Sequence, residues 1–174
     1  MKIYILGSVA SGKTTVAKKL SKKLGLPCYT TDDFVWERHK SGDIRNLEIT
    51  RNQKFNEIIR KDNWIIEGIH IGWTEEGMAN ADLILFLDVP YSTRTRRIFK
   101  RYFKQKLNME EANYRPTIRI VGKMMQWNRL FEQVMKPEAL KFLEEHKKKT
   151  RILKTEKEIE RTIRQLEVYS TSKN

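Results

Sequence analysis

The sequence predicts an α/β domain in which a parallel β-sheet is covered by helices on both faces. Segments typical of strands alternate along the whole chain with segments whose apolar residues recur at helical spacing. At least three of the strand segments are apolar on both faces, which is typical of a parallel sheet with helices on each side. The sequence has no internal repeat and no linker, so we expect residues 1–174 to form a single domain.

Five short apolar runs, rich in β-branched and aromatic residues, predict the strands. They cover residues 2–6, 27–30, 64–66, 83–87 and 151–153. The first run ends at Gly7, and the fourth ends at Asp88 and Pro90. Glycine and proline at these points are typical of the ends of strands.

Helical spacing of apolar residues predicts five longer segments as helices. They cover residues 13–24, 49–61, 92–107, 117–135 and 156–168. The first has two lysines in its last turn and Gly25 at its end, which are common signals of a helix C-terminus. We expect Ser92 to cap the third helix. We expect Pro137 to interrupt the fourth, before a further turn or two that continue to residue 146.

Composition excludes several classes of protein. Apolar residues make up 39% of the chain and charged residues 33%, which excludes a disordered chain. The apolar runs at residues 3–6 and 83–87 are too short to cross a bilayer, which takes roughly 20 residues, or to form a secretory signal. Cys28 is the only cysteine, so we expect no internal disulfide and no zinc site. The expected location is the cytoplasm, without membrane association.

The chain is strongly basic. Its 35 Lys and Arg residues exceed its 22 Asp and Glu residues and give a formal net charge of +13. Such an excess predicts attraction to polyanions, which include phosphorylated metabolites as well as nucleic acid. A basic, solvated surface is the alternative explanation, and charge alone does not choose between them.

Residues 7–14 read Gly-Ser-Val-Ala-Ser-Gly-Lys-Thr and match the phosphate-binding pattern Gly-x-x-x-x-Gly-Lys-Thr. A predicted strand precedes the motif, and a predicted helix begins inside it. Such a loop points successive backbone N–H groups at one anion, and the helix N-terminus adds partial positive charge. We expect Lys13 to reach the β- and γ-phosphates and the Thr14 hydroxyl to ligate Mg²⁺. The motif therefore predicts a nucleoside-triphosphate site rather than a glycine turn without a ligand.

Acidic residues follow three of the predicted strands. Asp32 and Asp33 follow the second, Glu67 follows the third, and Asp88 follows the fourth. The carboxyl ends of strands in an open parallel sheet face the ligand crevice. These side chains could therefore orient Mg²⁺-bound water, accept a proton from an attacking hydroxyl or bind substrate. A helix cap or a solvated turn is the alternative for each of them.

Three arginines share one side of the predicted helix that starts at Ser92. Arg94, Arg97 and Arg101 fall within an arc of roughly 60° at 100° per residue. We expect Arg97 and Arg101 to lie at the border between core and water, where a guanidinium can bind a phosphate. A plain basic face is the alternative.

The polar interval after this helix predicts a lid. Residues 113–116 and Arg119 form an arginine-bearing segment within a lid-like insertion at about residues 102–123, which could close over phosphates and exclude water. An ordinary helix connection is the alternative. The adjoining apolar residues of the preceding helix are Ile98, Phe99, Tyr102 and Phe103. The apolar residues after the interval that we expect in the core are Met124, Met125, Trp127, Leu130, Phe131 and Met135.

These features resemble the P-loop kinases of the adenylate-kinase type, and most closely the small bacterial proteins described as DNA topology modulation proteins or adenylate-kinase-related kinases. Besides the phosphate loop, the resemblance is carried by residues 32–36, 64–68 and 81–90 and by the pair Arg97 and Arg101. It implies the three-layer P-loop NTPase fold, with a five-stranded parallel sheet in the order 2-3-1-4-5. It also implies a lid entered through the arginine pair.

The resemblance further implies an acceptor site near Asp32, Trp36 and Gly68. The sequence departs from the family at two positions. Glu67 stands where the family usually has Asp, and Tyr91 stands where an Arg commonly follows the proline. Both departures concern the contacts expected for the acceptor.

The expected function is that of a Mg²⁺-dependent phosphotransferase that moves the γ-phosphoryl group of ATP to a small acceptor, a nucleoside monophosphate or a nucleoside. The expected catalytic residues are Lys13, Asp32, Arg97 and Arg101. The residues expected to bind the nucleotide are Gly7, Ser8, Val9, Ala10, Ser11, Gly12, Lys13, Thr14, Thr15, Arg97 and Lys154. The residues expected to bind the acceptor are Asp32, Trp36, Glu67, Gly68, Arg115 and Arg119.

The alternative function is a nucleic-acid-associated regulator that binds ATP as a switch and phosphorylates no acceptor. The net positive charge favours it. The sequence has no helix-turn-helix signature, zinc spacing or RNA-binding aromatic motif, so this function ranks second. A kinase acting on 5′-hydroxyl ends of nucleic acid would combine both.

Overall fold

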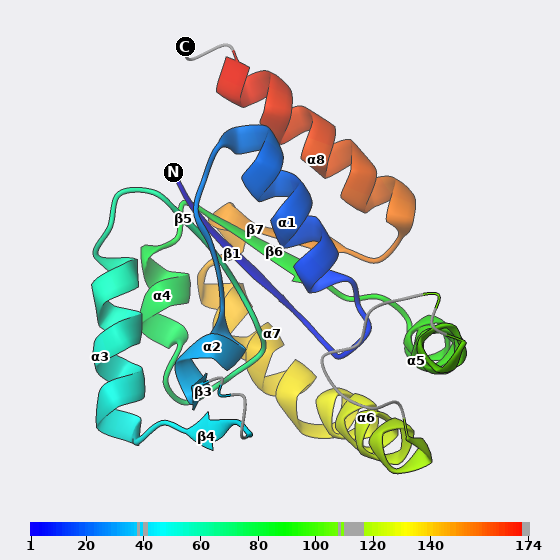
Figure 1. Cartoon of the computed structure of the whole chain (residues 1–174). Coiled ribbons are helices and arrows are strands. Elements are labelled where there is room, and N and C mark those ends of the chain that lie inside the picture. The colour runs from blue at the N-terminus through cyan, green and yellow to red at the C-terminus, as the bar shows by residue number, and fades with distance from the viewer. Residues whose placement is uncertain (38, 40–41, 108, 110–116, 172–174) are drawn as a thin grey trace.

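The structure is a computed structural model that describes residues 1–37, 39, 42–107, 109 and 117–171. Five parallel strands form the central sheet (Figure 1). They are β1 (Lys2–Gly7), β2 (Cys28–Thr30), β5 (Trp64–Glu67), β6 (Leu83–Leu87) and β7 (Thr150–Leu153). Their spatial order is β2-β5-β1-β6-β7. Counted along the chain within this sheet, that is the predicted order 2-3-1-4-5.

Helices cover both faces of the sheet (Figure 1). The α-helices in the described part of the chain are α1 (Lys13–Leu24), α2 (Thr31–Val35), α3 (Glu48–Ile59), α4 (Glu75–Asn80), α5 (Tyr91–Lys106), α6 (Ile118–Leu130), α7 (Lys136–Glu145) and α8 (Glu156–Thr171). A π-helical turn, η1 (Phe131–Met135), joins α6 to α7, and a 3₁₀ turn, η2 (Lys147–Lys149), precedes β7. The predicted α/β architecture is confirmed.

The two faces of the sheet pack against different helices. Ile3 and Ile5 of β1 belong to a core with α1 and α8, which lie side by side in Figure 1. Tyr4 and Leu6 point to the opposite face and belong to a core with α3, α4 and α7. Since successive strand residues point to opposite faces, a strand buried on both must be apolar throughout. This explains the unbroken apolar runs in the sequence.

Several short elements were not predicted. These are α2, α4 and a two-stranded antiparallel hairpin of β3 (Trp36–Glu37) and β4 (Ile44–Arg45). Each is too short to show a period in the sequence. The hairpin and α2 follow β2 directly, so they lie beside the carboxyl edge of the sheet (Figure 1).

The expected interruption at Pro137 is wrong. Helical structure runs from α6 through η1 into α7, and the Lys136 N–H donates to the Phe131 carbonyl, five residues earlier. Proline lacks an N–H group and is tolerated in the first turn of a helix. The π-helical turn places Pro137 in such a first turn, so the chain stays helical.

The start and the buried face of α5 also differ from the prediction. Pro90, not Ser92, is the N-terminal cap residue, and no side chain caps this helix. Phe99 and Phe103 are 43% and 58% exposed, because Arg94 takes part of the buried face together with Ile98.

The apolar residues of α6 are less buried than predicted. Trp127 and Leu130 are 56% and 45% exposed, whereas Phe131 is fully buried. Met124, Met125 and Met135 are half-buried. Within the described residues no helix is both long enough and apolar enough to span a membrane.

Two helical glycines offer a matched test of the packing. A Cβ on Gly77 of α4 would lie 2.5 Å from the Phe55 ring, which is buried in the core, whereas a Cβ on Gly122 of α6 would meet nothing within 4 Å. We expect Gly77→Ala to lower the free energy of unfolding by about 1–3 kcal/mol through overpacking. Gly122→Ala should raise it by roughly 0.5–1 kcal/mol, because alanine favours the helix.

Urea denaturation of both variants measures this difference. Equal effects of the two substitutions would contradict the close packing of α3 against α4.

Candidate functional site

The phosphate loop connects β1 to α1 at the carboxyl edge of the sheet (Figure 1). Gly12 has φ 100°, a left-handed conformation that side chains rarely adopt. A Cβ on Gly7 would lie 2.8 Å from the Leu87 carbonyl oxygen, so no side chain fits there. Gly12 is also the N-terminal cap residue of α1 and offers no side-chain cap. The first N–H groups of α1 therefore point at the loop without a side-chain partner from the cap.

The side chain of Lys13, the first residue of α1, folds back against the phosphate loop. Its Nζ donates to the Ser8 carbonyl oxygen at 3.0 Å. Burial lowers the pKa of Lys13, while the carboxylates of Glu67 and Asp32 act in the opposite direction and Arg94 lowers it further. The ammonium therefore lies near charged groups from three other parts of the chain. A triphosphate bound by the loop would bring negative charge to this cation.

Thr14 and Glu67 form a pair suited to Mg²⁺. The Thr14 hydroxyl donates to Glu67 Oε1 at 2.7 Å, and Glu67 is buried at the end of β5. A hydroxyl and a carboxylate are hard oxygen donors, and Mg²⁺ in such sites takes its other ligands from phosphates and water. Among the described residues there is no cluster of three or more acidic, His or Cys side chains that could bind a metal alone. Glu67 was also expected to bind the acceptor, and its hydrogen bond in this structure is with the Thr14 hydroxyl.

Arg97 of α5 contacts the outer side of the phosphate loop. Its Nη1 donates to the carbonyl oxygens of Ala10 and Ser11 at 3.2 and 2.9 Å. Its Nη2 donates to Glu156 Oε1 at 2.7 Å, at the start of α8. One guanidinium thus joins the loop, α5 and α8.

A groove of about 650 Å³ lies beside these contacts. Its lining includes Gly12, Lys13, Thr14, Thr15, Arg97 and Arg101. Lys154, at the end of β7, is exposed and does not line the groove; its N–H donates to Glu158 Oε2 at 2.6 Å. The groove therefore joins the loop to both arginines predicted to bind phosphate, but not to Lys154, which was predicted to bind the nucleotide.

Asp32 lies on the other side of the loop, in the first turn of α2. Its Oδ1 is 3.3 Å from Nε2 of His70, which follows β5. Trp36, in the hairpin, is 38% exposed. Gly68 lies against Thr31, because a Cβ on Gly68 would be 1.7 Å from the Thr31 hydroxyl oxygen.

Sequence reasoning missed two residues of this region, His70 and Arg51. The Arg51 guanidinium lies 4.5 Å from the centre of the Trp73 ring, and the Trp73 ring lies 5.4 Å from that of His70. The only signal in the sequence for His70 is its place three residues after Glu67. Arg51 has no comparable signal, because its approach depends on the fold.

The remaining predicted residues are spread more widely. Asp33 is exposed on α2, and Arg119 is exposed near the start of α6. Arg115, and much of the predicted lid, lie outside the described residues. Asp88 is ion-paired with Lys136 at 2.6 Å, so its carboxylate contacts α7 rather than the phosphate loop.

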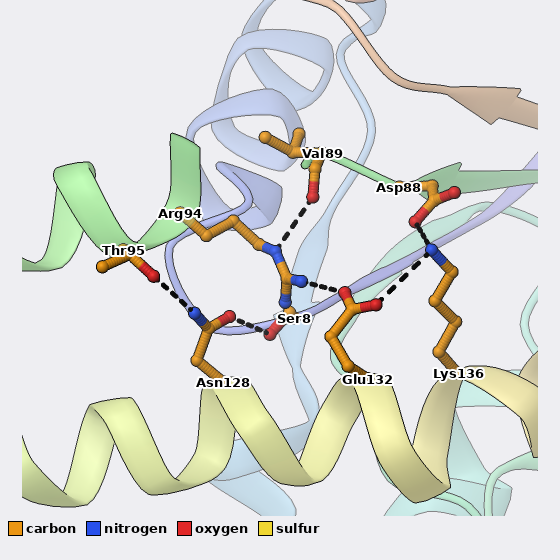
Figure 2. A network of polar contacts seen from close by, with 8 residues as sticks. All are labelled: Ser8, Asp88, Val89, Arg94, Thr95, Asn128, Glu132 and Lys136. Carbon is orange, nitrogen blue, oxygen red and sulfur yellow. Dashed lines mark hydrogen bonds and ion pairs between the residues drawn. The ribbon is translucent and has the colours of Figure 1, made fainter. Parts of the chain in front are cut away.

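A buried polar network supports the loop from below, as Figure 2 shows. Arg94 is fully buried; its Nε donates to the Val89 carbonyl oxygen at 2.9 Å and its Nη2 to Glu132 of η1. Burial lowers the pKa of Arg94, and Glu132 counteracts this. The Glu132 carboxylate also approaches Lys136 at 3.8 Å.

Asn128 of α6 forms the second part of this network (Figure 2). It is fully buried, and its amide donates to the Thr95 hydroxyl at 3.1 Å. Its Oδ1 accepts a long hydrogen bond of 3.4 Å from the Ser8 hydroxyl of the phosphate loop. The continuous helix of α6, η1 and α7 thus touches the loop, α5 and the end of β6.

A phosphate loop after the central strand of a five-stranded parallel sheet, in this strand order, defines the architecture of a P-loop kinase. The chain belongs to the AAA domain family, which it matches over residues 3–115.

Three curated relatives are about 30% identical to this chain over a little more than half of its length. A shikimate kinase of Aquifex aeolicus is 30% identical over 112 residues, which are 56% of this chain and 65% of that protein. A cytidylate kinase of Methanothermobacter thermautotrophicus is 31% identical over 113 residues, 60% of this chain and 70% of that one. An uncharacterized Bacillus subtilis protein is 29% identical over 59% of this chain and 57% of its own length. The chain thus spans less than two thirds of the first and third of these relatives.

Solved structures with the same fold cover nearly the whole chain. Shikimate kinase from Acinetobacter baumannii in complex with shikimate has a TM-score of 0.58 at 15% identity, over 99% of this chain and 94% of that chain. Shikimate kinase from Bacteroides thetaiotaomicron has a TM-score of 0.59 at 17% identity, over 97% of both chains. At this identity the comparison shows the fold.

The ion pair between the buried Arg94 and the half-buried Glu132 can be tested by a double-mutant cycle. Glu132→Gln leaves a buried guanidinium without its carboxylate, and we expect it to lower the free energy of unfolding by about 3 kcal/mol. The double variant Arg94→Met/Glu132→Gln should recover much of this loss. Arg96→Met, on the exposed side of the same helix, serves as the control and should change stability by less than about 0.5 kcal/mol.

Chemical denaturation of the wild type, of the single variants Arg94→Met and Glu132→Gln and of the double variant gives the coupling energy. Additive effects of the two core substitutions would show that Arg94 and Glu132 do not depend on each other.

Proposed function

We propose that the protein is an ATP-dependent phosphotransferase that moves the γ-phosphoryl group to a small acceptor, a nucleoside monophosphate or a nucleoside. The observation that carries this proposal is the position of Lys13 and of the Thr14–Glu67 pair at one edge of the sheet, with Asp32 on the far side. The loop provides a place for the triphosphate, and Asp32 and His70 border a place for an acceptor. The relatives named shikimate kinase and cytidylate kinase support a phosphotransferase.

Different residues of the site bind phosphate, hold Mg²⁺ and stabilise charge on the transferred group. The backbone N–H groups of residues 7–14 and the Lys13 ammonium bind phosphate oxygens. Thr14 and Glu67 hold Mg²⁺, which neutralises charge on the β- and γ-phosphates when bound. Arg97 and Arg101 border the groove beside the loop and stabilise charge on the transferred group. Catalysis then consists mainly of positioning and charge stabilisation.

The relatives with a named activity are shikimate kinase and cytidylate kinase, so the alternative of a nucleic-acid-associated regulator gains no support from them. The two functions differ in one measurable property. A phosphotransferase releases ADP in proportion to phosphorylated acceptor, whereas a regulator hydrolyses or binds ATP without any acceptor.

Removal of the loop lysine tests the assignment. We expect Lys13→Ala to lower acceptor-dependent turnover by at least about two orders of magnitude, because the variant loses the cation that contacts the transferred phosphoryl group. Lys22→Ala, an exposed position in the last turn of the same helix, is the matched control and should retain the wild-type rate.

Coupled ADP release gives the rates, and isothermal calorimetry with Mg-ATP gives the affinities. Near-normal turnover of Lys13→Ala would refute the site. An ATPase rate that no acceptor changes would refute the phosphotransferase.

A further inference from the structure

Two loops at the carboxyl edge of the sheet are in unusually close contact. Gly68, directly after β5, approaches Thr31 at the start of α2, and its lack of a Cβ is what allows this approach. Thr31 is 1% exposed, so this contact is sealed from water. Asp32 directly follows Thr31, and His70 lies two residues after Gly68, so the contact brings Asp32 and His70 close together.

His70 and Asp32 form a carboxylate–imidazole pair. His70 Nε2 lies 3.3 Å from Asp32 Oδ1. The backbone of His70 is held as well, because its carbonyl oxygen accepts a hydrogen bond from the Thr74 hydroxyl, which is fully buried. The side chains of His70 and Asp32 are 35% and 63% exposed, so a small molecule can reach both.

This pair lies next to the phosphate loop. The Asp32 carboxylate is close enough to Lys13 to raise its pKa against the effect of burial. Glu67, the residue before Gly68, accepts the hydrogen bond of Thr14. If Lys13 holds the transferred phosphoryl group, the Asp32–His70 pair therefore lies on the side from which an acceptor would approach.

The chemistry of the pair distinguishes two kinds of acceptor. An alcohol must lose its proton when its oxygen attacks, so a nearby carboxylate can act as general base. A phosphate monoester has a second pKa of about 6 and is largely a dianion at neutral pH, with no proton to lose. A carboxylate at this position repels a phosphate nucleophile and does nothing for its attack.

From this geometry we infer that the acceptor oxygen is an alcohol hydroxyl, that Asp32 takes its proton, and that His70 is a positioning residue for Asp32. The inference rests on the proposed phosphotransferase and narrows its acceptor class. In the step, the hydroxyl oxygen forms a bond to the γ-phosphorus, and the bond between that phosphorus and the bridging oxygen breaks. ADP leaves with the electron pair, and the hydroxyl proton moves to the Asp32 carboxylate.

His70 acts through Asp32. A neutral imidazole that donates its Nε2–H holds the carboxylate in place and leaves it ionised. A protonated imidazole adds positive charge and makes the carboxylate a weaker base. The charged groups on elements around His70 include Arg51 of α3, which lies over Trp73, and Glu75 of α4, which accepts the Gly72 N–H at 2.5 Å, in addition to Glu67.

An acceptor panel tests the alcohol assignment. Coupled ADP release is measured with nucleosides, shikimate and simple sugars as alcohols, and with the nucleoside monophosphates as phosphates. We expect at least one alcohol to raise ADP release about tenfold or more above the ATPase background, with transfer to its hydroxyl seen by ³¹P NMR. Transfer to the phosphate of a monophosphate would overturn the inference and leave the phosphotransferase intact. No acceptor-dependent release from the whole panel would reject the phosphotransferase itself, and the inference with it.

The role of His70 is tested by measuring kcat and KM with the active alcohol at about pH 8. We expect His70→Ala to lower kcat/KM about tenfold or more, the loss typical of a hydrogen bond to a charged group. The loss should fall on kcat rather than on KM, because His70 acts on the proton acceptor. His70→Gln keeps a donor and should restore most of the rate.

His146→Gln is the matched control, because this histidine packs on Phe142 at the far end of α7. It should keep the wild-type kcat and KM. Thermal unfolding confirms that each variant is folded. A loss confined to KM in His70→Ala, or no rescue by His70→Gln, would show that His70 does not act on the proton transfer.

Discussion

The chain has no room for a side chain where its central strand ends. Strand β1 is buried on both faces and lies between β5 and β6, and a Cβ on Gly7 would meet the carbonyl oxygen of Leu87. The backbone therefore leaves the sheet in a tight turn and enters α1 through the left-handed Gly12. This tight turn at the end of β1 determines the positions of the phosphate loop, of Lys13 and of Thr14 beside Glu67.

The sequence was most informative where local chemistry decides the structure. The bounds of α1 follow from the phosphate loop before it and from Gly25 after it, and both are visible as residue types. The sheet order followed from the resemblance to P-loop kinases rather than from periodicity. Elements of five or six residues, such as α2 and α4, are too short to show the helical spacing of apolar residues, so the local sequence did not predict them.

The errors on α5 have one physical cause. Helical spacing predicted an apolar face with Phe99 and Phe103, but a buried arginine occupies part of the inner face and both rings are exposed. Arg94 can be buried because Glu132, 38 residues later, neutralises it. Such a partner belongs to a different helix, and no pattern within α5 reveals it. The pairing of His70 with Asp32 escaped prediction for the same reason.

The contact of Arg97 with Glu156 gives the C-terminal helix an influence on a loop formed by the other end of the chain. Glu156 has no chemistry of its own to offer a nucleotide. In a saturation scan it would nevertheless score as sensitive, since replacing it frees a guanidinium that otherwise lies fixed against the loop carbonyls. Tolerance to substitution along α8 should consequently be uneven, and its first residue, Glu156, should tolerate substitution less well than its exposure suggests.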